Sequence, residues 1–179
     1  MYVYYTASTL DGFLADENDS LAWLLTQPID DDGPFNIDDL MSATGAIVMG
    51  ATTYQWVVDH IAASGDSWPY GDYPTFVFTH RDIDVVDPSV TVLSGRPAEH
   101  RATLEAAAGE KSVWVVGGGD LAAQFAEASM LDEMTVSYAP ATVGAGRPLF
   151  PRPFDFELLE TARNKAFLIG RYRVVGPRT

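Results

Sequence analysis

Three consecutive glycines, Gly117-Gly118-Gly119, interrupt an apolar stretch and carry the strongest chemical signal in this sequence. The β-branched and aromatic residues at 113–116 predict a buried strand, and Leu121 and Phe125 recur afterwards at helical spacing. Glycines without Cβ atoms let a ligand approach the backbone closely, and the free amides at a helix start attract an anion. The pattern predicts either a cradle for a nucleotide phosphate or only a tight turn.

Two further sites repeat parts of this chemistry. Gly50 follows the compact apolar stretch 46–49 and opens a second helical pattern, so it forms another strand-glycine-helix junction. The predicted strand 75–79 ends in His80-Arg81, and Arg81 is the first lysine or arginine of the chain. A phosphate must therefore be held by backbone amides, by hydroxyls, or by a cation from Arg81 onward.

These junctions require a sheet whose strands end at one edge. Strands are predicted at 2–7, 46–49, 75–79, 90–93, 113–116 and 133–138, with a terminal antiparallel hairpin of 154–162 and 166–175. Helices are predicted at 21–25, at 36–44 with Asn36 as N-cap and Gly45 after its end, from 50, at 97–108 and from 120. The alternation predicts an α/β fold with a mostly parallel central sheet, helices on both faces, and that hairpin at its C-terminal edge.

Composition bounds the class of protein. We expect one domain over residues 1–179, because this length suits a single core. The net charge of -14 excludes nucleic acid and anionic membrane surfaces as partners, since both repel an acidic protein. We expect a cytoplasmic protein, because there is no cysteine, no signal-like N-terminus and no long apolar run. Residues 1–80 carry twelve acidic side chains and no lysine or arginine.

Five short motifs, taken together, resemble the dihydrofolate reductase superfamily. They are Ala7-Ser-Thr-Leu-Asp-Gly-Phe13, Val48-Met-Gly-Ala-Thr-Thr-Tyr54, Phe78-Thr-His-Arg81, Val115-Val-Gly-Gly-Gly-Asp-Leu121 and Gly146-Arg-Pro-Leu-Phe-Pro151. They are most similar to the branch that contains the C-terminal reductase domain of the bifunctional riboflavin-biosynthesis deaminase-reductase. The resemblance covers nearly the whole chain and implies a dihydrofolate reductase-like fold and a homodimer.

The resemblance also implies NADPH as the hydride donor, lying across the carboxyl ends of the strands. The glycine triad would receive the pyrophosphate, Gly50 with its helix the other phosphate, and Arg81 the adenosine 2′-phosphate. The implied cofactor residues are Ala7, Gly50, Thr52, Thr53, Thr79, His80, Arg81, Val116, Gly117, Gly118, Gly119, Asp120 and Leu121. Many members carry a basic residue where Ala51 stands, so the preference for NADPH over NADH rests mainly on Arg81.

On the substrate side, the resemblance points to Ser8, Asp11 and Ser137. Ser8 and Asp11 belong to a Ser-x-x-Asp-Gly motif that borders substrate and nicotinamide in the riboflavin-type branch, and water or Asp11 would deliver a proton. Ser137 corresponds to a hydroxyl residue that faces the ring in folate reductases. The alternatives are that Asp11 is only the turn residue before Gly12 and that Ser137 is an ordinary strand serine.

Asp19 and Ser20 stand where folate reductases carry a buried carboxylate for the pterin ring. Ser20 takes the matching position, and a serine cannot hold a pteridine as a carboxylate does, so we rank folate below another heterocycle. We favour the alternative that Asp19 and Ser20 cap the helix at 21–25. A phosphoribosyl substrate would need a cation, which Arg147 or Arg152 could supply.

The implied activity is NAD(P)H-dependent reduction of a small heterocyclic substrate, similar to the 5-amino-6-(5-phosphoribosylamino)uracil reductase of riboflavin biosynthesis. The alternatives are a non-catalytic nucleotide- or ligand-binding module of the same fold, and a dihydrofolate reductase. No metal is expected, because the three histidines lack metal-ligand spacing. The run Asp30-Asp-Asp-Gly33 lacks the pattern of a calcium loop and is predicted to be a solvated face.

Overall fold

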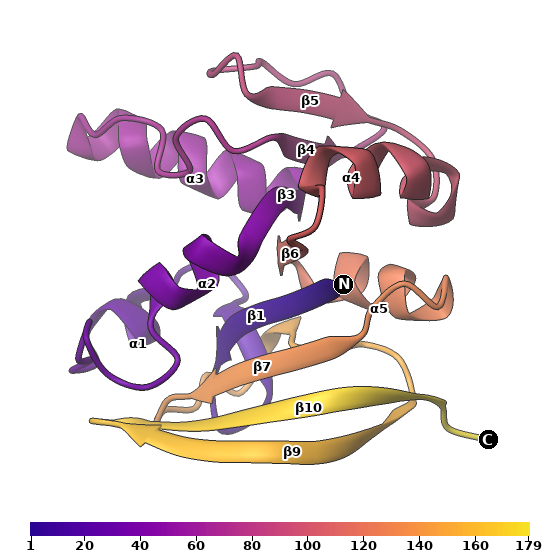
Figure 1. The fold of residues 1–179 in the computed structure, drawn as a ribbon. Coiled ribbons are helices and arrows are strands. Elements are labelled where there is room, and N and C mark those ends of the chain that lie inside the picture. Colours follow the sequence, from indigo (N-terminus) through magenta and orange to yellow (C-terminus); the bar gives the residue numbers. More distant parts are fainter.

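The computed structural model describes all 179 residues and is built on an eight-stranded sheet with the order β5-β4-β3-β6-β1-β7-β10-β9 (Figure 1). Its strands are β1 (Tyr2–Ser8), β3 (Thr44–Gly50), β4 (Thr75–Phe78), β5 (Val90–Leu93), β6 (Ser112–Gly117), β7 (Glu133–Tyr138), β9 (Phe154–Asn164) and β10 (Phe167–Pro177). The helices are α1 (Ala22–Leu25), α2 (Ile37–Ala43), α3 (Ala51–Ser64), η1 (Pro97–His100), α4 (Arg101–Ala108) and α5 (Gly119–Glu127). The predicted α/β fold is confirmed.

The strands from β5 to β7 run parallel, and β10 is antiparallel to both of its neighbours, β7 and β9. Parallel neighbours need crossover connections, which helices provide except between β4 and β5, where the segment 79–89 contains no helix. By contrast, β9 and β10 are joined by a short turn at Lys165. All parallel strands therefore end at one edge of the sheet. At that edge Met49 pairs with Gly117, so the two predicted glycine junctions follow neighbouring strands.

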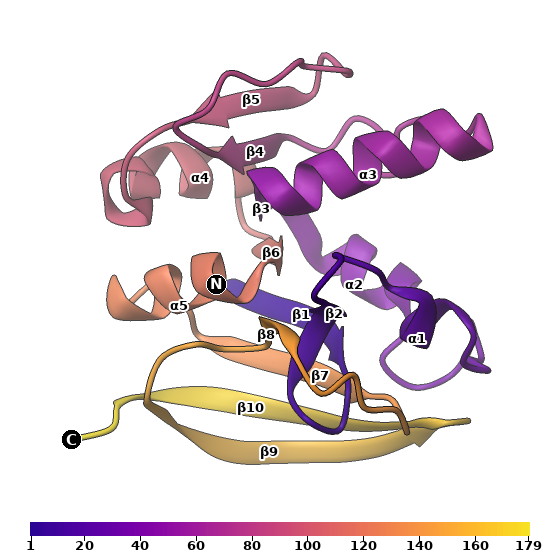
Figure 2. The same cartoon turned by 180° about the vertical axis from the view of Figure 1, so that it is seen from behind.

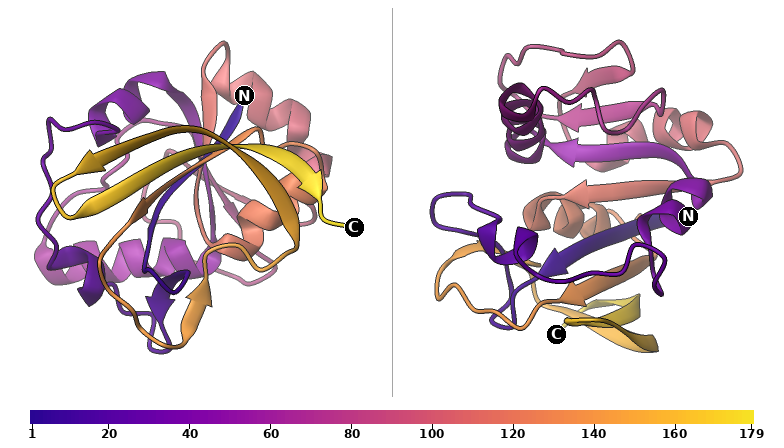
Figure 3. Two further views of the ribbon diagram at one scale, coloured as in Figure 1. Left: turned by 90° about the horizontal axis from the view of Figure 1, so that it is seen from below. Right: turned by 90° about the vertical axis from the view of Figure 1, so that its left-hand side faces the viewer.

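Side chains alternate between two buried faces, as expected for strands covered on both sides. On β3, Ala46 and Val48 join the larger core with Leu104 and Phe125, which come from α4 and α5. Ile47 and Met49 join a second core with Tyr54 of α3. Figures 1 and 3 show α2 and α3 on one side of the sheet and α4 and α5 on the other.

Two predicted helix ends differ from the structure. Asn36 caps α2 as predicted, since its side chain accepts a 2.8 Å hydrogen bond from the amide of Asp39. However, β3 begins directly at Thr44, so Gly45 lies inside the strand and does not terminate the helix. A Cβ at Gly45 would collide with the backbone of Ala108, which explains the glycine by close packing. The predicted helix 97–108 begins as the 3₁₀ helix η1 and continues as α4.

A two-stranded antiparallel sheet lies in segments for which no strand was predicted. It pairs β2 (Phe13–Asp16) with β8 (Gly146–Pro148), so that Ala15 lies opposite Arg147. Figure 2 shows β2 and β8 side by side in front of β7. The sheet brings two segments of the chain, more than a hundred residues apart, to the edge where the parallel strands end. None of the helices is both long and apolar enough to cross a lipid bilayer.

Candidate functional site

The two glycine junctions lie against one another. Gly50 is the N-cap of α3 and Gly118 is the N-cap of α5, and neither helix has a side chain bonded to its first amides. A Cβ built on Gly50 would lie 3.9 Å from both the carbonyl oxygen of Gly117 and the amide nitrogen of Gly118. Two helix N-termini with free N–H groups therefore open at one place, which suits a ligand with two linked anionic groups.

The three glycines of the triad have different surroundings. A Cβ at Gly119 would collide with the backbone carbonyls of Pro148 and Leu149, so this glycine is required by packing. A Cβ at Gly117 would lie 3.3 Å from the hydroxyl oxygen of Thr53. A Cβ at Gly118 would meet no atom within 4 Å, and the peptide bond between Gly117 and Gly118 is cis. Gly118 is thus the position where the backbone is open to a ligand.

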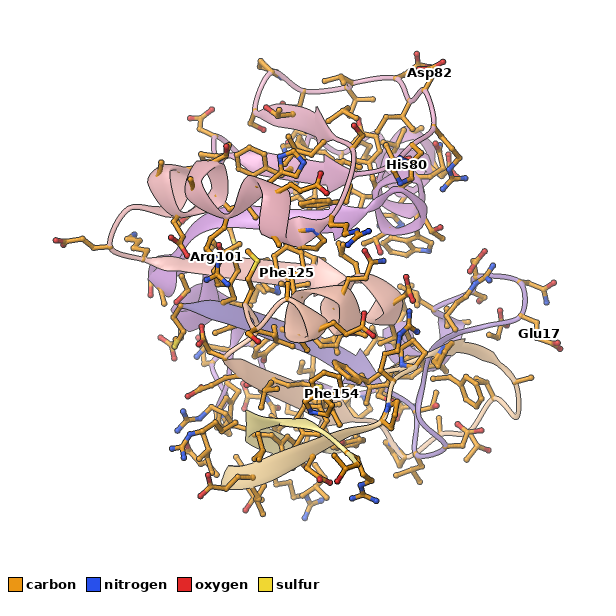
Figure 4. The ribbon with its side chains drawn as sticks, turned by 90° about the vertical axis from the view of Figure 1, so that its right-hand side faces the viewer. Glu17, His80, Asp82, Arg101, Phe125 and Phe154 are labelled. Carbon is orange, nitrogen blue, oxygen red and sulfur yellow. The ribbon has the colours of Figure 1, made fainter.

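Both junctions open into one cavity of about 950 Å³. This volume is large for a small-molecule site and can hold a nucleotide's reactive end together with a second molecule. Its lining contains most of the residues predicted from the sequence, namely Ala7, Asp19, Gly50, Thr52, Thr53, Thr79, His80, Val116, Gly117, Gly118, Gly119, Asp120, Leu121, Ser137 and Arg147. Residues from five strand ends are therefore brought together. Figure 4 labels His80 and Glu17 on this side of the molecule and Arg101 away from it.

Four predicted residues do not line the cavity: Ser8, Asp11, Ser20 and Arg81. Ser8 is fully buried, and its hydroxyl donates to the carbonyl of Thr9 at 3.0 Å. The hydroxyl of Ser20 accepts from the amide of Ala22 at 3.2 Å, beside the start of α1. Arg81 is exposed directly after His80, and its backbone amide donates to the hydroxyl of Thr79 at 2.9 Å. Arg81 thus follows a lining residue directly in the sequence, and its guanidinium makes no ion pair.

The Asp11 carboxylate is engaged by the loop that follows β7. It accepts hydrogen bonds from the amides of Val143 and Gly144, at 3.1 and 2.7 Å, and from the hydroxyl of Thr9. The Thr9 hydrogen bond, aided by the two amides, holds the pKa of Asp11 below its ordinary value. A carboxylate held in its charged form away from the cavity is a poor proton donor, but it fastens two loops together.

Asp19 forms a two-point ion pair with Arg147. The guanidinium Nε and Nη2 atoms donate to the two carboxylate oxygens at 2.6 and 2.9 Å. This hydrogen bonding keeps the pKa of Asp19 below its ordinary value and raises that of Arg147. The interpretation of Asp19 as a helix cap is wrong, because its carboxylate binds Arg147 and accepts from no amide of α1. Ser20 does accept from the first amide of α1, that of Ala22, although the N-cap position itself is Leu21. Because β2 pairs with β8, Arg147 lies close enough to Asp19 to bind its carboxylate.

Arg152 is the second cation that could have entered the cavity, and it does not line it. Its guanidinium bonds the carboxylates of Asp120 and Glu127 at 2.8 and 3.2 Å. Asp120 sits in the first turn of α5, where its charge would oppose a bound phosphate. The pairing with Arg152 reduces this repulsion and leaves the α5 amides available.

Sequence reasoning missed the apolar part of the lining. It includes Tyr5, Leu14, Leu21, Leu24, Phe35, Trp56 and Phe167. Their spacing indicates core or short helix and carries no sign of a cavity. The Tyr5 hydroxyl donates to the carbonyl of Phe35, and burial raises the pKa of Tyr5, so the phenol stays neutral. The sequence also missed that Asp30 and Asp31, which are exposed as predicted, line the cavity.

The comparisons with known proteins agree with this geometry. The sequence profile of the RibD C-terminal domain family matches residues 2–167. The chain belongs to the RibD C-terminal domain family. It is 28% identical over 148 residues to YwjB of Bacillus subtilis, a protein of uncharacterised function, covering 83% of this chain and 81% of YwjB. The predicted superfamily is thereby confirmed.

Solved structures share the fold. A provisionally assigned riboflavin biosynthesis protein from Shewanella sp. PV-4 has a TM-score of 0.80 at 24% identity, covering 97% of this chain and 98% of that one. The diaminohydroxyphosphoribosylaminopyrimidine deaminase/5-amino-6-(5-phosphoribosylamino)uracil reductase of Thermotoga maritima has a TM-score of 0.70 at 18% identity, covering 98% and 56%. Enterococcus faecalis dihydrofolate reductase, solved with NADP(H) and RAB-propyl, has a TM-score of 0.61 at 14% identity, covering 97% and 96%.

Proposed function

We propose that this protein is an NAD(P)H-dependent reductase of a small heterocyclic compound. The observation that carries the proposal is the pair of uncapped helix N-termini, at Gly50 and Gly118, which open into one end of a cavity with a largely apolar remainder. The free amides suit the two phosphates of a dinucleotide, and the open space at Gly118 admits the pyrophosphate to the backbone. Membership of a reductase-domain family supports the same assignment.

The chain's own residues would mainly position the reactants. The first amides of α3 and α5, with the hydroxyls of Thr52 and Thr53, would hold the phosphates. The apolar lining would exclude bulk water from the rings, and the hydroxyl of Ser137 would contact the ring at the end of β7. When bound, the nicotinamide supplies a hydride to an imine-like or carbonyl carbon of the substrate. Water would then supply the proton, since Asp11 is held outside the lining.

We assign the adenosine 2′-phosphate to Arg81, with Thr79 and His80 beside it. Thr79 and His80 line the cavity, and the guanidinium of Arg81 follows them without a competing carboxylate. An arginine is the side chain best suited to a phosphate, because it donates several hydrogen bonds in one plane. NADPH would therefore bind more tightly than NADH.

One observation favours a second candidate function, a nucleotide-binding module without turnover. The carboxylate expected to act as acid, Asp11, is committed to loop amides. The two candidates differ in one measurement, the loss of NADPH absorbance at 340 nm in the presence of reducible pyrimidine and pteridine compounds. Binding of NADPH together with its oxidation supports the reductase. Tight binding without oxidation across the panel supports the module, and absence of NADPH binding refutes both.

A further inference from the structure

The substrate end of the cavity has an unusual charge arrangement. The segment between β2 and α2 contributes three carboxylates to the lining, those of Asp19, Asp30 and Asp31. Arg147 is the single lysine or arginine in the whole lining, and the Asp19 carboxylate already neutralises its charge through hydrogen bonds from Nε and Nη2. Neither Asp30 nor Asp31 forms an ion pair. The substrate end therefore carries net negative charge and offers no free cation.

Other cations close to this end are also engaged elsewhere. Lys165 lies against the same loop, where its ammonium donates to the carbonyl of Ile29 at 3.0 Å, and it does not line the cavity. Arg152 is held by Asp120 and Glu127 on the side of α5. A phosphate group placed at this end would lie near unpaired carboxylates and would have to share Arg147 with Asp19 or displace that carboxylate to gain a cation.

The remaining lining at this end suits a ring compound. Leu24, Phe35 and Phe167 belong to one packed cluster and present apolar surface to the cavity. An aromatic heterocycle can stack on such surface, while amino substituents can donate hydrogen bonds to carboxylates. Neutral and cationic rings therefore satisfy every feature of this end, whereas a phosphorylated compound leaves its own charge unbalanced.

We propose that the Asp19–Arg147 pair determines specificity: it occupies the one cation of the cavity, so that the site takes an unphosphorylated, amino-substituted heterocycle. This inference rests on the proposed reductase function of the same cavity. It separates this chain from a reductase of 5-amino-6-(5-phosphoribosylamino)uracil, the activity printed in the name of the Thermotoga maritima protein.

The test compares two ligands that differ only in the phosphate. These are 5-amino-6-(5-phosphoribosylamino)uracil and the same compound with a free 5′-hydroxyl, titrated calorimetrically into the protein with and without saturating NADPH. We expect the unphosphorylated compound to bind at least about tenfold more tightly. Equal or tighter binding of the phosphorylated compound overturns the inference, and so does binding of neither. NADPH titration alone tests the proposed function, so the two failures are distinguishable.

A pair of variants tests the role of the ion pair itself. Asp19→Asn releases Arg147, and Asn tolerates the positive φ of 59° at this position. Asp31→Asn removes the same charge from the lining but leaves Arg147 paired. We expect Asp19→Asn to tighten binding of the phosphorylated compound by about tenfold and Asp31→Asn by less than about threefold. Equal effects of the two variants would show that the total negative charge of the lining, and not the release of Arg147, sets the preference for the unphosphorylated compound.

Discussion

Gly50 and Gly118 lie side by side, with 3.9 Å between a Cβ position on Gly50 and the amide nitrogen of Gly118. They are separated by 68 positions in the sequence, and each begins a helix that follows one of two neighbouring parallel strands. Because parallel strands end at the same edge, the positive ends of both helix dipoles meet there. This relationship explains why one cavity can offer backbone amides to both phosphates of a dinucleotide.

Substitution of neighbouring glycines should separate binding from packing. Gly118→Ala places a methyl group in open space beside the cavity, so we expect a stable protein whose NADPH affinity falls at least about tenfold, or about 1.4 kcal/mol. Gly119→Ala forces a methyl group against the carbonyls of Pro148 and Leu149, and we expect it to lower the unfolding free energy by about 1–3 kcal/mol. Thermal unfolding with and without NADPH measures both effects. Unchanged NADPH affinity in Gly118→Ala would contradict the assigned pyrophosphate position.

Arg81→Ala should remove the preference for NADPH over NADH. The variant loses the guanidinium assigned to the 2′-phosphate, so we expect NADPH affinity to fall about tenfold while NADH affinity stays within about twofold. Lys111→Ala is the matched control. It removes the same charge, but Lys111 precedes β6 and therefore lies at the opposite edge of the sheet. Fluorescence titration of both cofactors gives the comparison. If the wild-type protein binds both cofactors equally, the role of Arg81 is refuted.

Asp11→Asn should loosen a loop and leave the chemistry largely intact. We expect a lower Tm, because Asn keeps only one acceptor oxygen for the donors of Thr9, Val143 and Gly144 and places an NH₂ donor against the rest. We expect kcat to fall by less than about tenfold. A proton donor would instead cost about a hundredfold or more in kcat and would remove one limb of the pH profile. Steady-state rates from pH 5 to 9 distinguish these roles.

The acid dependence of stability provides a separate check on Asp11. Its pKa is lowered by the Thr9 hydrogen bond and the loop amides, so the folded protein favours the charged form. The charged carboxylate therefore contributes to stability in full above the ordinary pKa of 3.8. That contribution is lost as the pH falls through the lower pKa that Asp11 has in the folded protein. Below pH 4 the wild-type Tm should therefore fall more steeply than that of Asp11→Asn. Parallel acid profiles of the two proteins would show that the bonds to Asp11 contribute nothing.

Tyr5→Phe should weaken the wall of the cavity. The variant leaves the carbonyl of Phe35 without its hydrogen-bond donor. We therefore expect the free energy of unfolding to fall by about 1 kcal/mol and the Tm by about 2–4 °C. Tyr73→Phe is the matched control, because the Tyr73 hydroxyl donates to the carbonyl of Met41 at 3.1 Å outside the cavity. We expect comparable losses of stability in both variants and weaker ligand binding only in Tyr5→Phe. Equal ligand affinities would show that this bond does not shape the site.

The fold was predictable because its signals are local. The apolar stretch of β3, the Asn36 cap of α2 and the glycine between β6 and α5 are written in neighbouring residues, and each was recognised from residue type and order. Parallel order then places all strand ends together, so the predicted cofactor residues reach one cavity, except Arg81, which directly follows a lining residue. The sheet of β2 and β8 was missed, because its strands are short and lie in turn-rich sequence.

The sequence alone determined the sheet, its glycine junctions and the acidic character of the first 80 residues, because strand, turn and helix propensities act over a few positions. Tertiary structure decided which charges remain free. Asp19 meets Arg147 across 128 positions and Asp11 meets Gly144 across 133, contacts for which no local spacing exists. The same holds for Gly118 and Gly119, which are identical in sequence yet differ in whether backbone from β8 lies above them.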